Sequence, residues 1–208
     1  MRARWDELQK MVSSCRRCET DLPDIGVDCP PRLLYPDGIN PPNAINILFV
    51  GVAPPKTGHS FHTDPSDNLW LGLSSVLRDI RRPCATLPAF YDRGFFLLHT
   101  AKCSIRGTTS PNLEVSQLCS SVHLSNEIDY LAPEAVCWLS KNVCFPVAQA
   151  EAARRGFPSH LRFGLPVALP VGNKSVPFLA TAWPGRGWQE ITRRHLKSLF
   201  ALLRIPEW

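Results

Sequence analysis

The sequence of 208 residues has no apolar run that reaches the roughly 18 residues needed to cross a bilayer. It has no internal repeat and no low-complexity tract, and its 23 Lys and Arg only slightly exceed its 18 Asp and Glu, for a net charge of +5. These absences exclude membrane-spanning, fibrous and disordered proteins. The segment from Met1 to Val12 carries charges where a signal peptide would be apolar, so we expect a cytoplasmic, intracellular protein that binds no membrane.

The residues that are present suffice for one globular unit. With 44% hydrophobic residues the chain can bury a single core, and we expect one domain over residues 1–208. The small positive excess fits the binding of phosphate groups or nucleic acid.

Short apolar runs alternate along the chain with segments whose apolar residues have helical spacing. Four short apolar runs are typical of buried strands: 45–50, 95–98, 135–139 and 176–182. Helical spacing predicts five helices: 2–12, 68–80, 113–131, 143–155 and 189–203. Repeated prolines between Thr20 and Asn43 exclude a regular helix or central strand there, so we expect a long loop. The alternation indicates an α/β domain with a largely parallel sheet and helices on both faces.

Ligands of such sheets usually bind at the carboxyl ends of the strands. In this chain those ends lead into three loops, which begin at Gly51, His99 and Thr181. We therefore look for a functional site in these loops.

The cysteines are the second feature of the sequence. Disulfide frameworks mostly serve small secreted domains, so we expect reduced thiols or ligands of a metal or cluster. Cys15 and Cys18 form a C-x2-C pair, and Cys103 and Cys119 form a second pair separated by fifteen residues. Four thiolates can bind zinc or hold a four-iron four-sulfur (4Fe-4S) cluster. We interpret the other cysteines as small buried hydrophobic residues: Cys29, Cys84, Cys137 and Cys144.

Several motifs together resemble the iron-sulfur members of the uracil-DNA glycosylase superfamily. They are the segment Ile47-Leu-Phe-Val-Gly-Val-Ala-Pro-Pro55, the Lys102-Cys103 pair after a predicted strand, and Cys119 downstream. The order and spacing of the two cysteine pairs match the cluster ligands of these enzymes. In addition, Thr57-Gly-His-Ser-Phe-His-Thr-Asp64, followed by Ser66, is similar to the T-G-R-x-F-T-G-D-x-S motif of family five.

This resemblance implies a three-layer α/β/α sandwich with a central, mainly parallel, four-stranded sheet. It implies a 4Fe-4S cluster on the four matched cysteines, which would tie the N-terminal helix and Pro-rich loop, residues 1–44, to the core. It further implies a monomeric DNA repair enzyme of base excision, which flips a uracil-like, deaminated or modified base, hydrolyses its N-glycosidic bond and leaves an abasic site.

Cleavage of that bond places positive charge on the sugar and negative charge on the base, so the site needs a carboxylate and hydrogen-bond donors. We predict that Asp64 positions the attacking water and stabilises the positively charged sugar. The alternative is that Asp64 is a turn or helix-cap aspartate. We assign His99 to the base as a donor or acid-base group, with a structural histidine as the alternative. Phe61 is predicted to stack on the flipped base or to belong to the core.

Four further residues complete the predicted base pocket: Gly51, Val52, Ala53 and Trp183. Gly51 and Ala53 allow the backbone to approach the base closely. Three pocket positions differ from the family's motifs. Val52 stands where family four has Glu, His99 where it has Asn, and Trp183 where the superfamily has the histidine that donates to the base.

Three arginines are predicted to contact DNA, with solvated surface charges as the alternative: Arg16, Arg17 and Arg186. Arg16 and Arg17 would lie beside the DNA backbone, and Arg186 would contact a phosphate or enter the position that the flipped base leaves. Three other functions stay open. The altered pocket positions favour a glycosylase for a bulky modified base in foreign (phage) DNA. The second alternative is a catalytically inactive DNA-binding module with the same fold. The third is a zinc-stabilised interaction protein.

Overall fold

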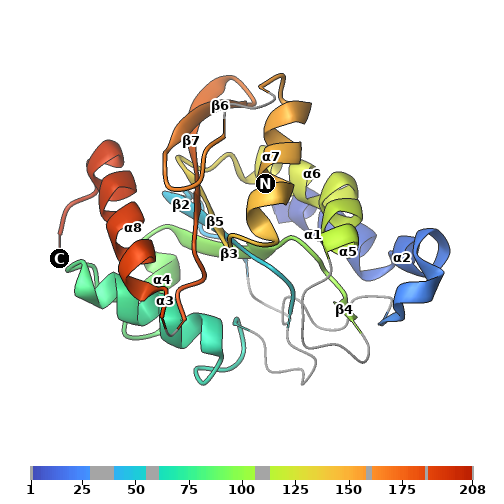
Figure 1. Cartoon of the computed structure of the whole chain (residues 1–208), viewed down its shortest axis with the longest axis horizontal. Coiled ribbons are helices and arrows are strands. Elements are labelled where there is room, and N and C mark those ends of the chain that lie inside the picture. The colour runs from blue at the N-terminus through green and yellow to red at the C-terminus, as the bar shows by residue number, and fades with distance from the viewer. Residues whose placement is uncertain are drawn as a thin grey trace.

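The computed structural model describes residues 2–28, 40–54, 61–105, 113–157, 161–185 and 187–207. Its centre is a five-stranded sheet with the order β3-β2-β5-β7-β6 (Figure 1). Four strands run parallel and correspond to the four predicted strands: β2 (Ile47–Gly51), β3 (Phe95–His99), β5 (Val136–Leu139) and β7 (Lys174–Thr181). The α/β class with a mainly parallel sheet is therefore confirmed.

The sheet has one strand more than the four that the sequence predicts. The additional strand, β6 (Val167–Val171), pairs antiparallel with β7 at the edge of the sheet. Gly172, in the left-handed region at φ 59°, and Asn173 form the tight connection between the two strands. Pro170 hides β6 from a pattern search, but an edge strand tolerates a proline because one side of its backbone needs no partner.

All five predicted helices are present, with ends within one residue of the prediction. They are α1 (Arg2–Ser13), α3 (Asn68–Asp79), α7 (Cys144–Arg154), α8 (Gln189–Leu203) and a composite helix over 113–131. The composite helix consists of α5 (Leu113–Cys119), the π-helical turn η2 (Ser120–Leu124) and α6 (Ser125–Leu131). The sequence did not predict the short elements: α2 (Arg17–Asp21), η1 (Pro23–Ile25), α4 (Leu87–Asp92), and β1 (Val27–Asp28) paired with β4 (Ser104–Ile105).

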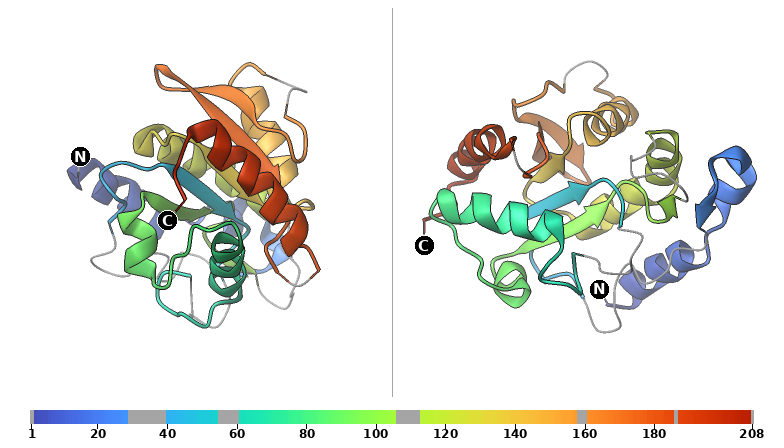
Figure 2. Two further views of the ribbon diagram at one scale, coloured as in Figure 1. Left: turned by 90° about the vertical axis from the view of Figure 1, so that its left-hand side faces the viewer. Right: turned by 60° about the horizontal axis from the view of Figure 1, so that its bottom comes forward.

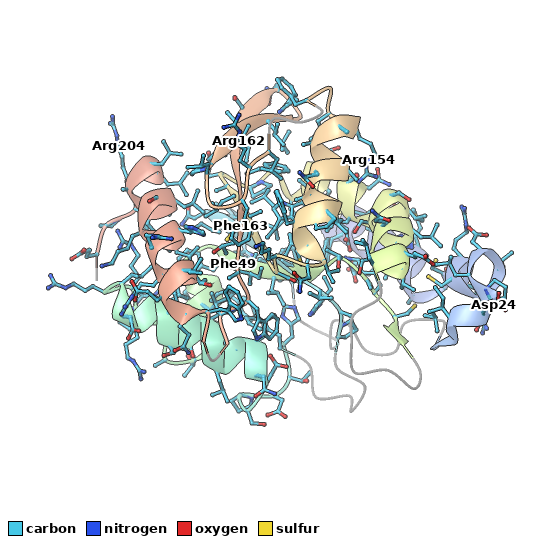
Figure 3. All side chains as sticks on the ribbon, viewed as in Figure 1. Asp24, Phe49, Arg154, Arg162, Phe163 and Arg204 are labelled. Atoms are coloured by element: carbon cyan, nitrogen blue, oxygen red, sulfur yellow. The ribbon has the colours of Figure 1, made fainter. Side chains whose placement is uncertain are left out.

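The helices cover both faces of the sheet (Figure 2), an arrangement compatible with the predicted three-layer sandwich. Alternate side chains of β2 point to opposite faces. Phe49 packs with residues of α3, α4 and α8, and its ring centroid lies 5.7 Å from that of Phe90 (Figure 3). Leu48 and Val50 pack with residues of α1, α6 and α7 on the other face. No helix among the described residues is long and apolar enough to span a membrane.

The described part of the N-terminal segment packs on the domain through apolar contacts. Trp5 of α1 stacks on Tyr130 at 5.9 Å and meets the ring of Phe96 edge-on at 6.0 Å. Farther along, Cys18 and Val27 share a small buried cluster with residues that follow β3 and with α5. These contacts place α2 and β1 beside Cys103, which follows β3, and beside α5, which ends at Cys119.

Candidate functional site

The candidate site lies at the carboxyl ends of the parallel strands, which meet at one edge of the sheet (Figure 1). Gly51 at the end of β2 pairs with His99 at the end of β3. A Cβ at Gly51 would lie 3.0 Å from Leu69 Cδ2 and 3.3 Å from His99 Cδ2. The absence of a side chain at Gly51 lets the imidazole and the first turn of α3 approach the β2 backbone closely. Next to Gly51, Val52 is buried and Ala53 half-buried.

His99 is 2% exposed. Burial, then the nearby His62 and Lys102, hold the pKa of His99 well below its usual value, so the ring is neutral at pH 7. Its Nδ1 is buried and has no hydrogen-bond partner in the part of the chain that the structure describes. The assignment of His99 to the base and its structural alternative both stay predictions.

A buried ion pair fixes the backbone just after His99. Lys102 Nζ lies 2.5 Å from Glu127 Oε2 of α6, and both side chains are 0% exposed. The same ammonium donates a hydrogen bond to the His99 carbonyl at 2.9 Å. Nearby, the Thr100 hydroxyl donates to the Val52 carbonyl at 2.6 Å, which ties the loop after β3 to the loop after β2. Sequence reasoning missed the pair, because no local pattern shows that residues 25 positions apart meet.

The π-helical turn η2 lies between the ligand candidate Cys119 and Glu127. Such turns are rare and frequently occur at functional sites. Here the turn includes His123, which is 5% exposed. Burial, and then the Lys102 charge, lower the pKa of His123 to about 4.

The predicted ligand cysteines lie in one region of the molecule. Cys18, Cys103 and Cys119 are buried, Cys15 is half-buried, and the described cysteines are all reduced. Cys18 and Cys103 share one apolar cluster. The Lys102 N–H donates to Cys119 Sγ at 3.2 Å, and burial raises the pKa of Cys119 to about 11, with Cys15 close enough to add to the rise.

The donor set suits zinc or an iron-sulfur cluster, since both bind thiolates. Within the described residues, no three or more His, Cys, Asp or Glu side chains are arranged so that they could hold a metal ion. Cluster binding therefore stays a prediction. Among the other cysteines, Cys84, Cys137 and Cys144 are buried, as expected of small hydrophobic residues, and Cys29 lies outside the described residues.

Phe61 is a core residue in this structure, at 1% exposure, with the rings of Trp70 and Phe90 edge-on at 5.6 and 5.4 Å. The core alternative therefore describes its position. Its neighbour His62 accepts from the Tyr91 hydroxyl at Nδ1 over 2.7 Å and donates from Nε2 to the Leu97 carbonyl over 3.2 Å. A carbonyl can only accept, so the proton is on Nε2.

Asp64 is half-buried and forms a tight turn. Its Oδ1 accepts hydrogen bonds from the Ser66 N–H and hydroxyl, both at 2.7 Å. Asp67 caps α3 instead, by accepting from the N–H groups of Leu69 and Trp70. The turn role that was the alternative for Asp64 is thus present, and the predicted role toward water and sugar stays a prediction. The preceding motif residues, 57–60, lie outside the described part of the chain.

The loop after β7 packs directly on α3. A Cβ at Gly72 of α3 would lie 2.5 Å from the Pro184 carbonyl oxygen, and one at Gly185 would lie 2.5 Å from Trp183 Nε1. Gly72 costs helix propensity of about 1 kcal/mol, and the space that it leaves is filled by this loop. The half-buried Trp183 therefore lies in a loop that packs on α3. Sequence reasoning missed Gly72, although a glycine inside a predicted helix signals a close contact.

The predicted DNA-contacting arginines are less informative. Arg16 and Arg17 are exposed and form ion pairs with Glu19 at 3.1 Å and Asp21 at 2.8 Å. Arg186 lies outside the described residues. No protein-family model matches the chain, and a search of curated proteins finds no significant match.

Proposed function

We propose that the protein is a DNA glycosylase with a uracil-DNA glycosylase-like, three-layer fold, which hydrolyses the N-glycosidic bond of a uracil-like, deaminated or otherwise modified base and leaves an abasic site. The observation that carries the proposal is His99, an almost fully buried histidine whose Nδ1 has no partner among the described residues. An unsatisfied buried polar atom costs about 1–3 kcal/mol. Such an atom at the carboxyl edge of a parallel sheet is typical of a site that completes its hydrogen bonds with a ligand.

The chemistry of base departure fits this residue. The leaving base carries negative charge, and a neutral imidazole can donate an N–H to a base oxygen. Exclusion of water strengthens that hydrogen bond. In the proposal His99 is the donor or acid-base group for the base, and the Asp64 carboxylate positions water and stabilises the positive sugar. The pocket around them is formed by Gly51, Val52 and Ala53 after β2 and by Trp183 after β7.

The four cysteines have a structural part in the proposal. Cys15, Cys18, Cys103 and Cys119 would hold a 4Fe-4S cluster, whose contribution is to stabilise the fold of the chain around it. The thiols come from segments that already lie side by side through the Cys18 cluster. The net charge of +5 supports DNA as the partner of a monomer.

The decisive experiment is a glycosylase assay on DNAs that carry uracil, hypoxanthine, xanthine, hydroxymethylated or glucosylated bases, scored as cleavage at abasic sites. We expect turnover on one of these bases and a loss of about 100-fold or more in His99→Gln and in Asp64→Asn. Asp24→Asn is the matched control, because this carboxylate is exposed and lies at the margin of the molecule (Figure 3). Equal turnover in His99→Gln and the wild type would refute the assignment of His99.

A second candidate is a catalytically inactive DNA-binding module. It is favoured by Asp64, whose Oδ1 already accepts two hydrogen bonds from Ser66, as in a purely structural turn. Tight DNA binding without cleavage of any base on the panel, unchanged in Asp64→Asn, would favour this candidate over the enzyme.

A further inference from the structure

A cavity lies at the carboxyl ends of the parallel strands, between the ends of β5 and β7. Its volume is about 120 Å³, and it is lined by Ser140, Lys141, Asn142, Ala182, Trp183 and Trp188. The first three of these residues follow β5 directly, and the others belong to the segment between β7 and α8. Trp183 also packs against the core cluster that includes residues of α3 and α8.

The two indoles of this cavity differ in their exposure to solvent. Trp183 is half-buried, and its ring lies directly over Gly185, where a Cβ would be 2.6 Å from Cδ1. Trp188, just before α8, is 48% exposed. The cavity thus has one fixed aromatic wall and one open aromatic face.

A cation lies at the rim of the cavity. Lys141 is exposed, and its Nζ is 5.8 Å from the centroid of the Phe163 ring. No carboxylate among the described residues forms an ion pair with it, in contrast to Lys174, which pairs with Glu134 at the opposite edge of the sheet. The ammonium is therefore available to an anionic ligand.

We propose that this cavity binds an unpaired nucleobase of a DNA strand, stacked on Trp188, with the adjoining phosphate on Lys141. The inference rests on the proposed function and specifies its substrate class: single-stranded DNA, or DNA opened beside the target nucleotide. A planar ring joined to an anion is the chemistry that an exposed indole beside a lysine recognises. Bases inside a duplex are covered on both faces by their neighbours, so they reach the indole only when they are unstacked.

The test is fluorescence anisotropy with a labelled single-stranded oligothymidine and with the same sequence as a duplex. We expect tighter binding to the single strand, about tenfold weaker binding in Trp188→Ala, and retention of most of the affinity in Trp188→Phe. We also expect the oligonucleotide to quench the tryptophan emission of the wild type, and Trp188→Phe to lose most of this quenching. Leu202→Ala is the control for an exposed apolar side chain, since 14 helical residues place it about 20 Å from Trp188.

The lysine has its own measurement. Lys141→Gln is expected to reduce the slope of log affinity against log salt by about 0.7, the contribution of one phosphate contact on a single strand. Lys174→Gln is the matched control at the opposite edge of the sheet and leaves the slope unchanged.

Three results would overturn the inference. The wild type does not bind the oligonucleotide, Trp188→Ala binds it as tightly as the wild type, or Trp188→Ala weakens binding of the duplex more than binding of the single strand. These results are separable from a failure of the proposed function. If the protein cleaves a base but Trp188→Ala leaves its DNA affinity unchanged, only the proposed base binding in the cavity is contradicted. Trp188-dependent binding without cleavage of any base supports the cavity and contradicts the enzyme.

Discussion

The buried ion pair of Lys102 and Glu127 gives the sharpest prediction of stability. Both side chains are completely shielded from water, and their charged atoms are 2.5 Å apart. Glu127→Gln keeps the shape of the side chain and removes its charge, so the ammonium of Lys102 stays buried beside the neutral His99 carbonyl at 2.9 Å without its counter-charge. Breaking such a pair from one side costs about 3–5 kcal/mol. In a domain of this size, each kcal/mol shifts the melting temperature by about 2–4 °C, so we expect a fall of about 6–20 °C.

The assay is urea and thermal unfolding of Glu127→Gln, Lys102→Met and the double variant Lys102→Met/Glu127→Leu. The double variant should regain most of the lost stability, because it buries no charge. Lys174→Gln, in the exposed pair with Glu134 at 2.6 Å, is the control and should cost less than about 1 kcal/mol. The reasoning is refuted if Glu127→Gln costs no more than this control, or if the double variant is less stable than both single variants.

Three other predictions follow from single contacts. Burial lowers the pKa of His62 to about 4, so as the pH falls the unfolded chain binds this proton first. His62 should therefore contribute a loss of stability of about 1.4 kcal/mol per pH unit between about pH 6 and pH 4, and His62→Asn should reduce the slope of a urea-unfolding series by that amount. Gly72→Ala should destabilise the protein despite better helix propensity, because the new Cβ meets the Pro184 carbonyl at 2.5 Å; a higher melting temperature would contradict this. Anaerobically purified protein should contain iron and sulfide that Cys119→Ala loses and Cys84→Ala keeps; stoichiometric zinc without iron would refute the cluster.

The sequence predicted the elements of the fold well, because their signals are local. The parallel strands β2, β3, β5 and β7 are short apolar runs, and each is buried against helices on both sides. The edge strand β6 was missed because its pattern is interrupted by Pro170. Its hairpin with β7 had a local signal in Gly172-Asn173, a dipeptide typical of two-residue connections.

The candidate site was less predictable, since its properties come from contacts between distant segments. Nothing local in the sequence distinguishes the neutral, buried His99 from an exposed histidine, because its state depends on Gly51, His62 and Lys102. Likewise, Gly72 within a predicted helix signals a close contact, but the sequence does not show that the Pro184 carbonyl makes this contact.

The five residues from His99 to Cys103 connect the two halves of the proposal. His99 faces the Gly51 backbone, Thr100 bonds to the loop after β2, and Lys102 donates from its ammonium to the His99 carbonyl and from its N–H to Cys119 Sγ. A displacement of Cys119 therefore moves the backbone of Lys102, and with it the hydrogen bond that fixes His99. In the proposed function, the cysteines would act on the candidate pocket through this segment, without contacting the base.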